Sequence, residues 1–297
     1  MTLQHRLELW LARALLAVLR ALGPVRASNL AGAFARTVGP LLPVSRIADV
    51  NLRLALPQLD RAARRRVVRG VWDNLGRTVG ELPHLGSLPQ GRLPGPSWYI
   101  EGGERIDALA ARGGPGILFS GHLGNWELMP VACAFHGVPV ASFYRAADNP
   151  AVDALMAELR LAATGGRSFL FPKGQTGSRQ AMAHLAKGGF LGVLFDQKMN
   201  DGVEARLFGR PTMTASGLAA MALRLRCPLV PGYVERLGPA RFRLIAEDAL
   251  PLPDTGDHAA DVLALTQAMN DRLEAWVRRK PESWLWLHRR WNKVLYN

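Results

Sequence analysis

The segment GHLGNWEL, residues 121–128, places a histidine and a glutamate five residues apart between glycines. A neutral imidazole can take a proton from an alcohol through one ring nitrogen, while a carboxylate on the other nitrogen fixes the tautomer and stabilises the imidazolium. We therefore interpret His122 as a candidate general base and Glu127 as its supporting carboxylate. The structural alternative is a helix N-terminus, where Glu127 favours the helix dipole and His122 only caps or packs.

The residues around this pair predict a strand, a turn and a helix. The apolar run 117–119 predicts a buried strand, and residues 126–135 predict a helix with Asn125 as its N-cap. The histidine then lies at the carboxyl end of a strand, where open α/β sheets bind ligands. Gly121 and Gly124 permit a sharp turn and a close approach of substrate. No third metal ligand lies near in sequence, and the chain has no GxSxG nucleophile motif.

A second polar pair, Asp196-Gln197, ends the apolar run 190–195 and thus also lies at the carboxyl end of a predicted strand. We expect it to line the same cleft, unless Asp196 only caps the next turn. Lys173, in FPKGQTG, is a candidate phosphate contact, although glycine-flanked lysines are common in surface loops. No GK[ST] follows it, so the segment is not a Walker motif.

These residues need elements to position them, and the chain divides into two parts. Residues 1–95 predict helices, including the basic amphipathic stretch 61–82, and Pro94, Gly95 and Pro96 then break the chain. From residue 96 to 297, short apolar runs alternate with stretches of helical spacing, which predicts an α/β sheet covered on both faces. Expected strands are 117–119, 138–144, 168–171, 190–195, 229–234 and 242–246, the last near a sheet edge; expected helices are 151–162, 178–185, 215–225 and 262–276.

The N-terminal stretch is apolar but interrupted. Arg6, Arg13 and Arg20 recur every seven residues, so they share one helical stripe, and the uncharged run 14–19 is far shorter than the ~20 residues of a spanning helix. Such a helix suits a membrane interface, with arginines at the head groups. It equally suits a surface helix packed on its own domain. A secretory signal is not expected.

The 37 basic and 24 acidic side chains give a net charge of +13, which predicts an anionic partner. Nucleic acid, an anionic membrane, a phosphorylated substrate and an acidic protein all qualify. Cys133 and Cys227 have no metal-binding spacing and predict buried thiols in a reducing compartment.

Taken together, the motifs resemble those of the lipid A late acyltransferases, the lauroyl and myristoyl transferase family. GHLGNWE resembles the family's H-x4-[D/E] block, and the likeness extends in order over most of the chain. It includes Asn51-Leu52 with the basic helix and Glu81, Tyr144-Arg145, Asn149-Pro150, Asp153 and Arg160, Asp196-Gln197, Phe208-Gly209 with Thr212 and Thr214, and PESWLWLHRRW at 281–291.

The resemblance implies transfer of a fatty acyl group from acyl carrier protein to a hydroxyl of a lipid A precursor. It implies a fold like that of the glycerol-3-phosphate acyltransferases, a mixed sheet flanked by helices with an N-terminal membrane-associating region. It also implies a place at the cytoplasmic face of the inner membrane, and neither a metal nor an organic cofactor. The expected partners are acyl carrier protein, the lipid A precursor and the anionic membrane surface.

Under this resemblance His122 is the catalytic base and Glu127 supports it. Arg145 and Arg160 are candidates for stabilising the oxyanion or holding phosphate, because an arginine fork can bind two oxygens. In the tail, His288, Arg289 and Arg290 are candidate substrate contacts; the alternative is a segment that closes the core. Asp196, Gln197 and Lys173 complete the expected substrate site.

Two other interpretations remain at this point. In the first, the acyl acceptor is a lysophospholipid, an amino-lipid or another glycolipid, and the chemistry is the same. Alternatively, the chain is a non-catalytic membrane- or nucleic-acid-binding protein, although it contains no RRM, KH, helix-turn-helix or zinc pattern, and no nucleic acid is expected as partner.

Overall fold

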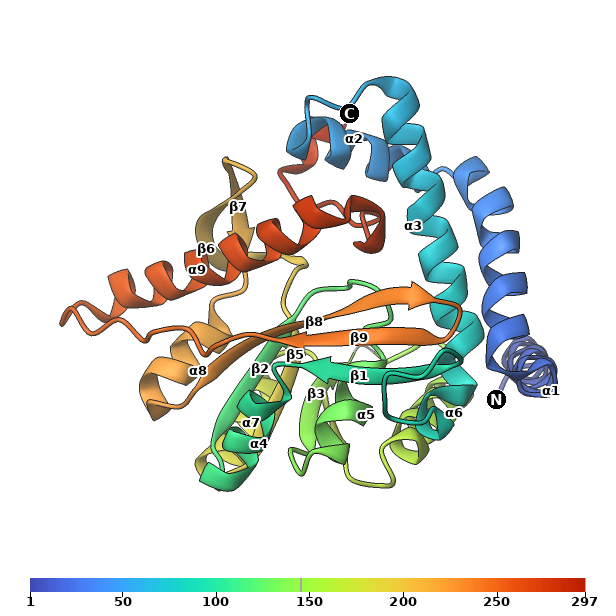
Figure 1. The fold of residues 1–297 in the computed structure, drawn as a ribbon. Coiled ribbons are helices and arrows are strands. Elements are labelled where there is room, and N and C mark those ends of the chain that lie inside the picture. The colour runs from blue at the N-terminus through green and yellow to red at the C-terminus, as the bar shows by residue number, and fades with distance from the viewer. Residues whose placement is uncertain (145, 297) are drawn as a thin grey trace.

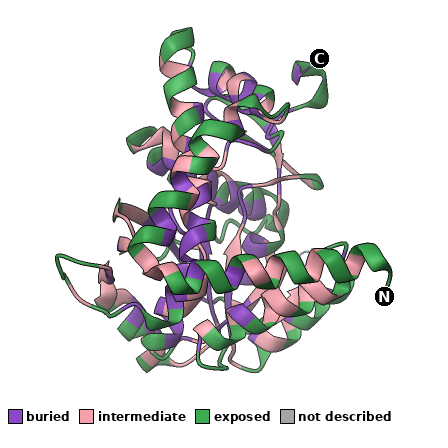
Figure 2. Ribbon diagram, turned by 90° about the vertical axis from the view of Figure 1, so that its right-hand side faces the viewer, coloured by how far each residue is buried: buried purple, intermediate pink, exposed green. Residues whose placement is uncertain are grey.

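The computed structural model describes residues 1–144 and 146–296. Three long helices come first in the chain: α1 (Leu3–Val38), α2 (Ser45–Ala55) and α3 (Arg61–Glu81). α1 is two helical segments, because Gly23 has non-helical backbone angles and Pro24 follows it. The second segment packs along α3, while the first projects across the molecule toward the N-terminus (Figure 2).

A seven-stranded sheet forms the centre of the molecule (Figure 1). Only β8 and β9 pair antiparallel, so the predicted mixed α/β sheet is confirmed. The strand predicted near an edge, β9, lies beside the edge strand β1. The order across the sheet is β1 (Ser97–Glu101), β9 (Arg241–Ala246), β8 (Leu229–Gly238), β2 (Gly116–Ser120), β5 (Phe190–Leu194), β3 (Val140–Tyr144) and β4 (Phe169–Pro172).

Helices cover both faces of the sheet (Figure 1). In β2, Phe119 packs against Trp276 of α9 on one face, while Leu118 belongs to a separate cluster with Cys133 and Val140 on the other. This double burial explains why the strand is continuously apolar. The helices of this part are α4 (Gly103–Arg112), α5 (Leu128–Phe135), α6 (Pro150–Ala163), α7 (Gln175–Ala186), α8 (Gly217–Leu225) and α9 (His258–Arg279).

Short elements complete the chain. A two-stranded antiparallel ribbon, β6 (Lys198–Leu207) with β7 (Arg210–Thr214), was not expected from the sequence. Its turn contains the Phe208-Gly209 pair, both with positive φ. The 3-10 turns are η1 (Gly39–Leu41), η2 (Leu82–Ser87), η3 (Pro281–Ser283) and η4 (Lys293–Tyr296). All elements before β1 are helical; the predicted division into two domains stays a prediction.

The contact between α1 and α3 depends on glycine. A Cβ built on Gly76 of α3 would lie 2.3 Å from the Ala31 carbonyl oxygen and 2.6 Å from the Ala35 Cβ. The two helices can approach this closely only because Gly76 has no side chain.

We therefore expect Gly76→Ala to destabilise the protein by about 2 kcal/mol, because overpacking against a backbone atom outweighs the gain in helix propensity. The matched control is Gly217→Ala, at the start of α8, where a Cβ would meet no atom within 4 Å. Urea unfolding monitored by circular dichroism measures both. Equal stability of the two variants would contradict the close helix contact.

Candidate functional site

His122 lies on the turn between β2 and α5, at the carboxyl end of β2 as predicted. Gly124 makes the turn possible: its φ is +57°, and a Cβ there would lie 2.1 Å from the Val234 carbonyl oxygen. The C-terminal segment pairs with the turn, since Leu285 N donates to the His122 carbonyl at 3.0 Å and Gly124 N donates to Ser283 O at 3.0 Å. The tail therefore holds the backbone of the turn at His122 and again at Gly124.

The carboxylate that contacts His122 is Asp196. His122 Nδ1 lies 2.7 Å from Asp196 Oδ1, and the His122 backbone N–H donates to Oδ2 at 2.8 Å. Trp284 Nε1 also donates to Oδ2, at 2.6 Å. The contact arises because β2 and β5 are parallel neighbours, with Ser120 opposite Leu194, so residues just after each strand meet.

Asp196 is almost fully buried, with 3% of its side chain exposed. Burial alone would raise its pKa, but the charge of His122, the two hydrogen bonds from that residue and the one from Trp284 together lower the pKa to about 2. Asp196 is thus ionised at neutral pH. It accepts the proton of Nδ1, which leaves Nε2 of a neutral His122 as a proton acceptor.

Glu127 does not occupy the position predicted for it. Its carboxylate accepts two hydrogen bonds from Arg160 of α6, from Nε at 2.9 Å and Nη2 at 2.7 Å. Nδ1 of His122 is already bound to Asp196, so the predicted His122–Glu127 contact is wrong for that nitrogen. Glu127 is instead the N-cap residue of α5. The hydrogen bond to Glu127 raises the pKa of Arg160, and its Nη1 has no hydrogen-bond partner among the described residues.

The N-cap prediction for Asn125 is also wrong. α5 begins at Leu128, and the Asn125 amide instead donates to the buried Glu81 at 2.8 Å. Glu81 further accepts from Ser28 Oγ at 2.7 Å and Ala240 N at 3.0 Å, and it pairs with Arg236. This network ties α1, α3, the turn that carries His122 and β8 together.

A cavity of about 560 Å³ opens beside His122. It lies against one face of the sheet, where Leu118 of β2, Ser142 of β3 and Gly192 of β5 line it. Residues of α5, α6 and η2 also line it. Most of its lining is apolar. The polar lining includes His122, Glu127, Arg160, Lys173, Gln197 and His288. A cavity of this character suits an apolar chain with a reacting polar end.

Lys173 and Gln197 lie in this cavity, as predicted, and contact each other. Lys173 Nζ donates to Gln197 Oε1 at 3.2 Å, and the Gln197 amide nitrogen lies 3.4 Å from His288 Nε2. The His288 ring is 6.1 Å from the His122 ring, centroid to centroid.

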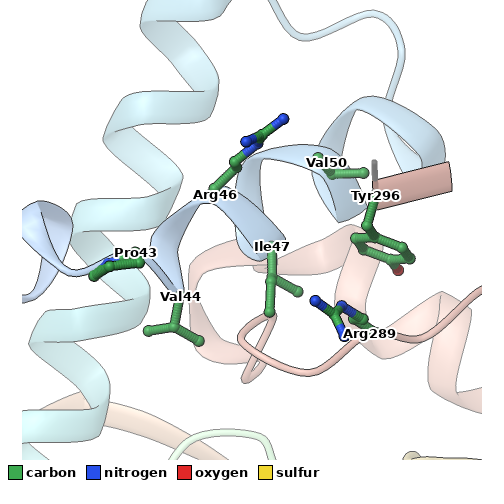
Figure 3. Close-up of a pocket in the computed structure, with 7 residues that line it drawn as sticks. All are labelled: Pro43, Val44, Arg46, Ile47, Val50, Arg289 and Tyr296. Atoms are coloured by element: carbon green, nitrogen blue, oxygen red, sulfur yellow. The ribbon is translucent and has the colours of Figure 1, made fainter. Parts of the chain in front are cut away.

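Arg289 and Arg290 lie elsewhere. Arg289 lines a separate pocket of about 280 Å³ with Arg46 of α2 and Tyr296 (Figure 3). Arg290 is 2% exposed, and its guanidinium donates to Thr212 Oγ1 at 2.6 Å and Thr214 Oγ1 at 3.0 Å. Burial lowers the Arg290 pKa to about 10. The prediction that Arg290 contacts substrate is therefore wrong: it fastens the tail to β7.

Other predictions have mixed outcomes. Arg145 lies outside the described residues. Cys133 and Cys227 are free, buried thiols, and burial raises the Cys133 pKa to about 12.

Residues 1–144 and 146–296 contain no helix with the length and apolar character to cross a membrane. The indole bond of Trp284 to Asp196 has no local sequence signal, because the contact spans 88 residues.

The chain is similar to known proteins over most of its length. The family model for bacterial lipid A biosynthesis acyltransferases matches residues 2–293. A lipid A biosynthesis acyltransferase from Haemophilus influenzae is 25% identical over 247 residues, which cover 81% of this chain and 73% of that protein. The family model's range spans the turn, both strand ends and the tail that line the cavity. The chain belongs to the bacterial lipid A biosynthesis acyltransferase family.

Proposed function

We propose that the protein transfers a fatty acyl chain from the thioester of acyl carrier protein to a hydroxyl of a lipid A precursor, with His122 as general base. The observation that carries the proposal is the His122–Asp196 pair beside a mostly apolar cavity. The net charge of +13 supports anionic substrates, both an acidic carrier and a phosphorylated lipid.

The reaction balances without a protein nucleophile. His122 Nε2 takes the proton of the acceptor hydroxyl as its oxygen bonds to the acyl carbon, and the carbonyl electron pair moves to oxygen. The tetrahedral intermediate then collapses, the C–S bond breaks, and the thiolate takes the proton from His122. Asp196 stabilises the imidazolium between these steps. The Nη1 of Arg160, which makes no hydrogen bond within residues 1–144 and 146–296, is available to a substrate oxygen.

The test measures transfer of labelled lauroyl, myristoyl and palmitoyl groups from acyl carrier protein to tetra-acylated lipid A precursor. We expect His122→Ala to lose activity by orders of magnitude, because no other imidazole that lines the cavity in the described part of the chain is hydrogen-bonded to a buried carboxylate. The control is His136→Ala, whose imidazole pairs with Asp107 away from the cavity.

Activity of His122→Ala at the wild-type level would overturn the base assignment. A wild type that is inert here but active with a lysophospholipid, an amino-lipid or another glycolipid would overturn the acceptor and leave the mechanism.

A second prediction separates the two carboxylates. Asp196→Asn should lower kcat about 10³- to 10⁴-fold, because an amide favours the wrong tautomer of its histidine partner. Glu127→Gln leaves the His122–Asp196 pair intact and acts through Arg160. Its effect should be no larger than that of Arg160→Gln, which also removes Nη1, and the double variant should be no worse than Arg160→Gln alone. Steady-state kinetics of the four variants measure this. Additive losses from Glu127→Gln and Arg160→Gln would show a separate role for Glu127.

We place the enzyme at the cytoplasmic face of the inner membrane, held by the first segment of α1. Its exposed apolar residues recur at three- and four-residue intervals on one face, and Arg6, Arg13 and Arg20 are exposed with them. Leu3 is 84% and Trp10 is 64% exposed. Such a face suits the head-group depth of an anionic bilayer.

Replacing Leu7, Trp10 and Leu11 with serine should therefore reduce co-sedimentation with vesicles that contain anionic phospholipid. Activity on a water-soluble acceptor should persist. The control replaces Leu263 of α9, which is 42% exposed, with serine. If both variants sediment like wild type, the first segment of α1 is not the membrane contact.

A further inference from the structure

His288 is the second imidazole in the cavity, and the chemistry so far does not use it. Its backbone is held firmly, because Asn51 Nδ2 of α2 donates to His288 O at 2.7 Å and to Trp286 O at 2.6 Å. Its ring faces His122 across 6.1 Å, on the cavity side of the tail. Unlike His122, it has no carboxylate partner among the described residues.

The neighbours of His288 determine which ring nitrogen carries its proton. Lys173 has only N–H donors, so the atom of Gln197 that faces Lys173 must be the amide oxygen. The amide nitrogen of Gln197 then faces His288 and donates to Nε2, at 3.4 Å. A neutral ring whose Nε2 accepts must carry its proton on Nδ1. That Nδ1–H has no acceptor among the described residues.

The charge state follows from the surroundings. Burial lowers the pKa of His288, the charges of His122 and Lys173 lower it further, and only Asp196 opposes them. These effects favour the neutral form of His288, and the ring, unlike that of His122, has no hydrogen-bonded carboxylate to stabilise an imidazolium. The neutral ring therefore has one N–H donor, at Nδ1.

We propose that His288 is a catalytic residue whose Nδ1–H donates to the acyl carbonyl oxygen and to the oxyanion that forms from it. The inference rests on the proposed acyl transfer. When the acceptor oxygen attacks, the carbonyl pair becomes a full charge on oxygen, and a pre-aligned donor stabilises that charge more than it stabilises the thioester. The proton stays on Nδ1 throughout, so the balance of the reaction is unchanged. Lys173 and Gln197 are positioning residues, which hold the tautomer.

The test compares His288→Ala, His288→Asn and His288→Gln in the same transfer assay. The asparagine amide nitrogen takes the place of Nδ1, whereas the glutamine amide reaches toward the place of Nε2. We expect His288→Ala to lower kcat by about 10²- to 10³-fold with little change in KM, as for loss of one oxyanion donor. His288→Asn should recover most of that loss, and His288→Gln should not.

Two results would overturn the inference. One is full activity of His288→Ala while wild type transfers acyl chains and His122→Ala does not; the proposed function then survives and only His288 is misassigned. The other is equal recovery of kcat by His288→Asn and His288→Gln, together with a raised KM in His288→Ala, which indicates a packing role. A wild type inert toward every acyl thioester and acceptor would overturn the proposed function and this inference together. Thermal unfolding of each variant separates loss of folding from loss of turnover.

Discussion

The carboxylate of Asp196 is the interaction on which the site depends. Three donors from two other segments converge on it: the backbone and ring of His122, and the indole of Trp284. A buried charge is costly unless it is paired and hydrogen-bonded, so removing any one donor penalises the folded state. The same bonds that satisfy Asp196 hold the tail against the turn and fix the tautomer of His122.

Glu81 plays the corresponding role on the other side of the turn. It is fully buried and joins Ser28 of α1, Asn125 of the turn and Arg236 of β8. Asn74 of α3 also donates to the Gly124 carbonyl, at 2.9 Å. The N-terminal helices are therefore part of the scaffold that positions His122, and the sequence pattern alone, which predicts a helical region before residue 96, contains no trace of this dependence.

Features that depend on neighbouring residues could be predicted from the sequence, whereas features that depend on contacts between distant residues could not. Six strands were predictable, because each is a short apolar run, and so was the place of His122 after a strand. Which carboxylate meets His122 was not, since it depends on β5 pairing with β2 rather than on spacing. The five-residue spacing favoured Glu127, yet its partner Arg160 lies 33 residues away. The tail was harder still: Arg290 is buried while Arg289 is exposed, and both sit in one basic run.

The cavity and the proposed membrane contact are mechanically linked through α6. Asn149, which caps this helix, donates to the His5 carbonyl at 2.9 Å and to Glu8 at 2.8 Å, both on the first segment of α1. Eleven residues later, about 16 Å along the helix, Arg160 lines the cavity and grips Glu127. The helix α6 thus sets the distance between the first segment of α1 and the Arg160–Glu127 pair. With the proposed membrane contact, an acceptor lipid whose head group lies at the depth of α1 would reach His122 without leaving the interface entirely.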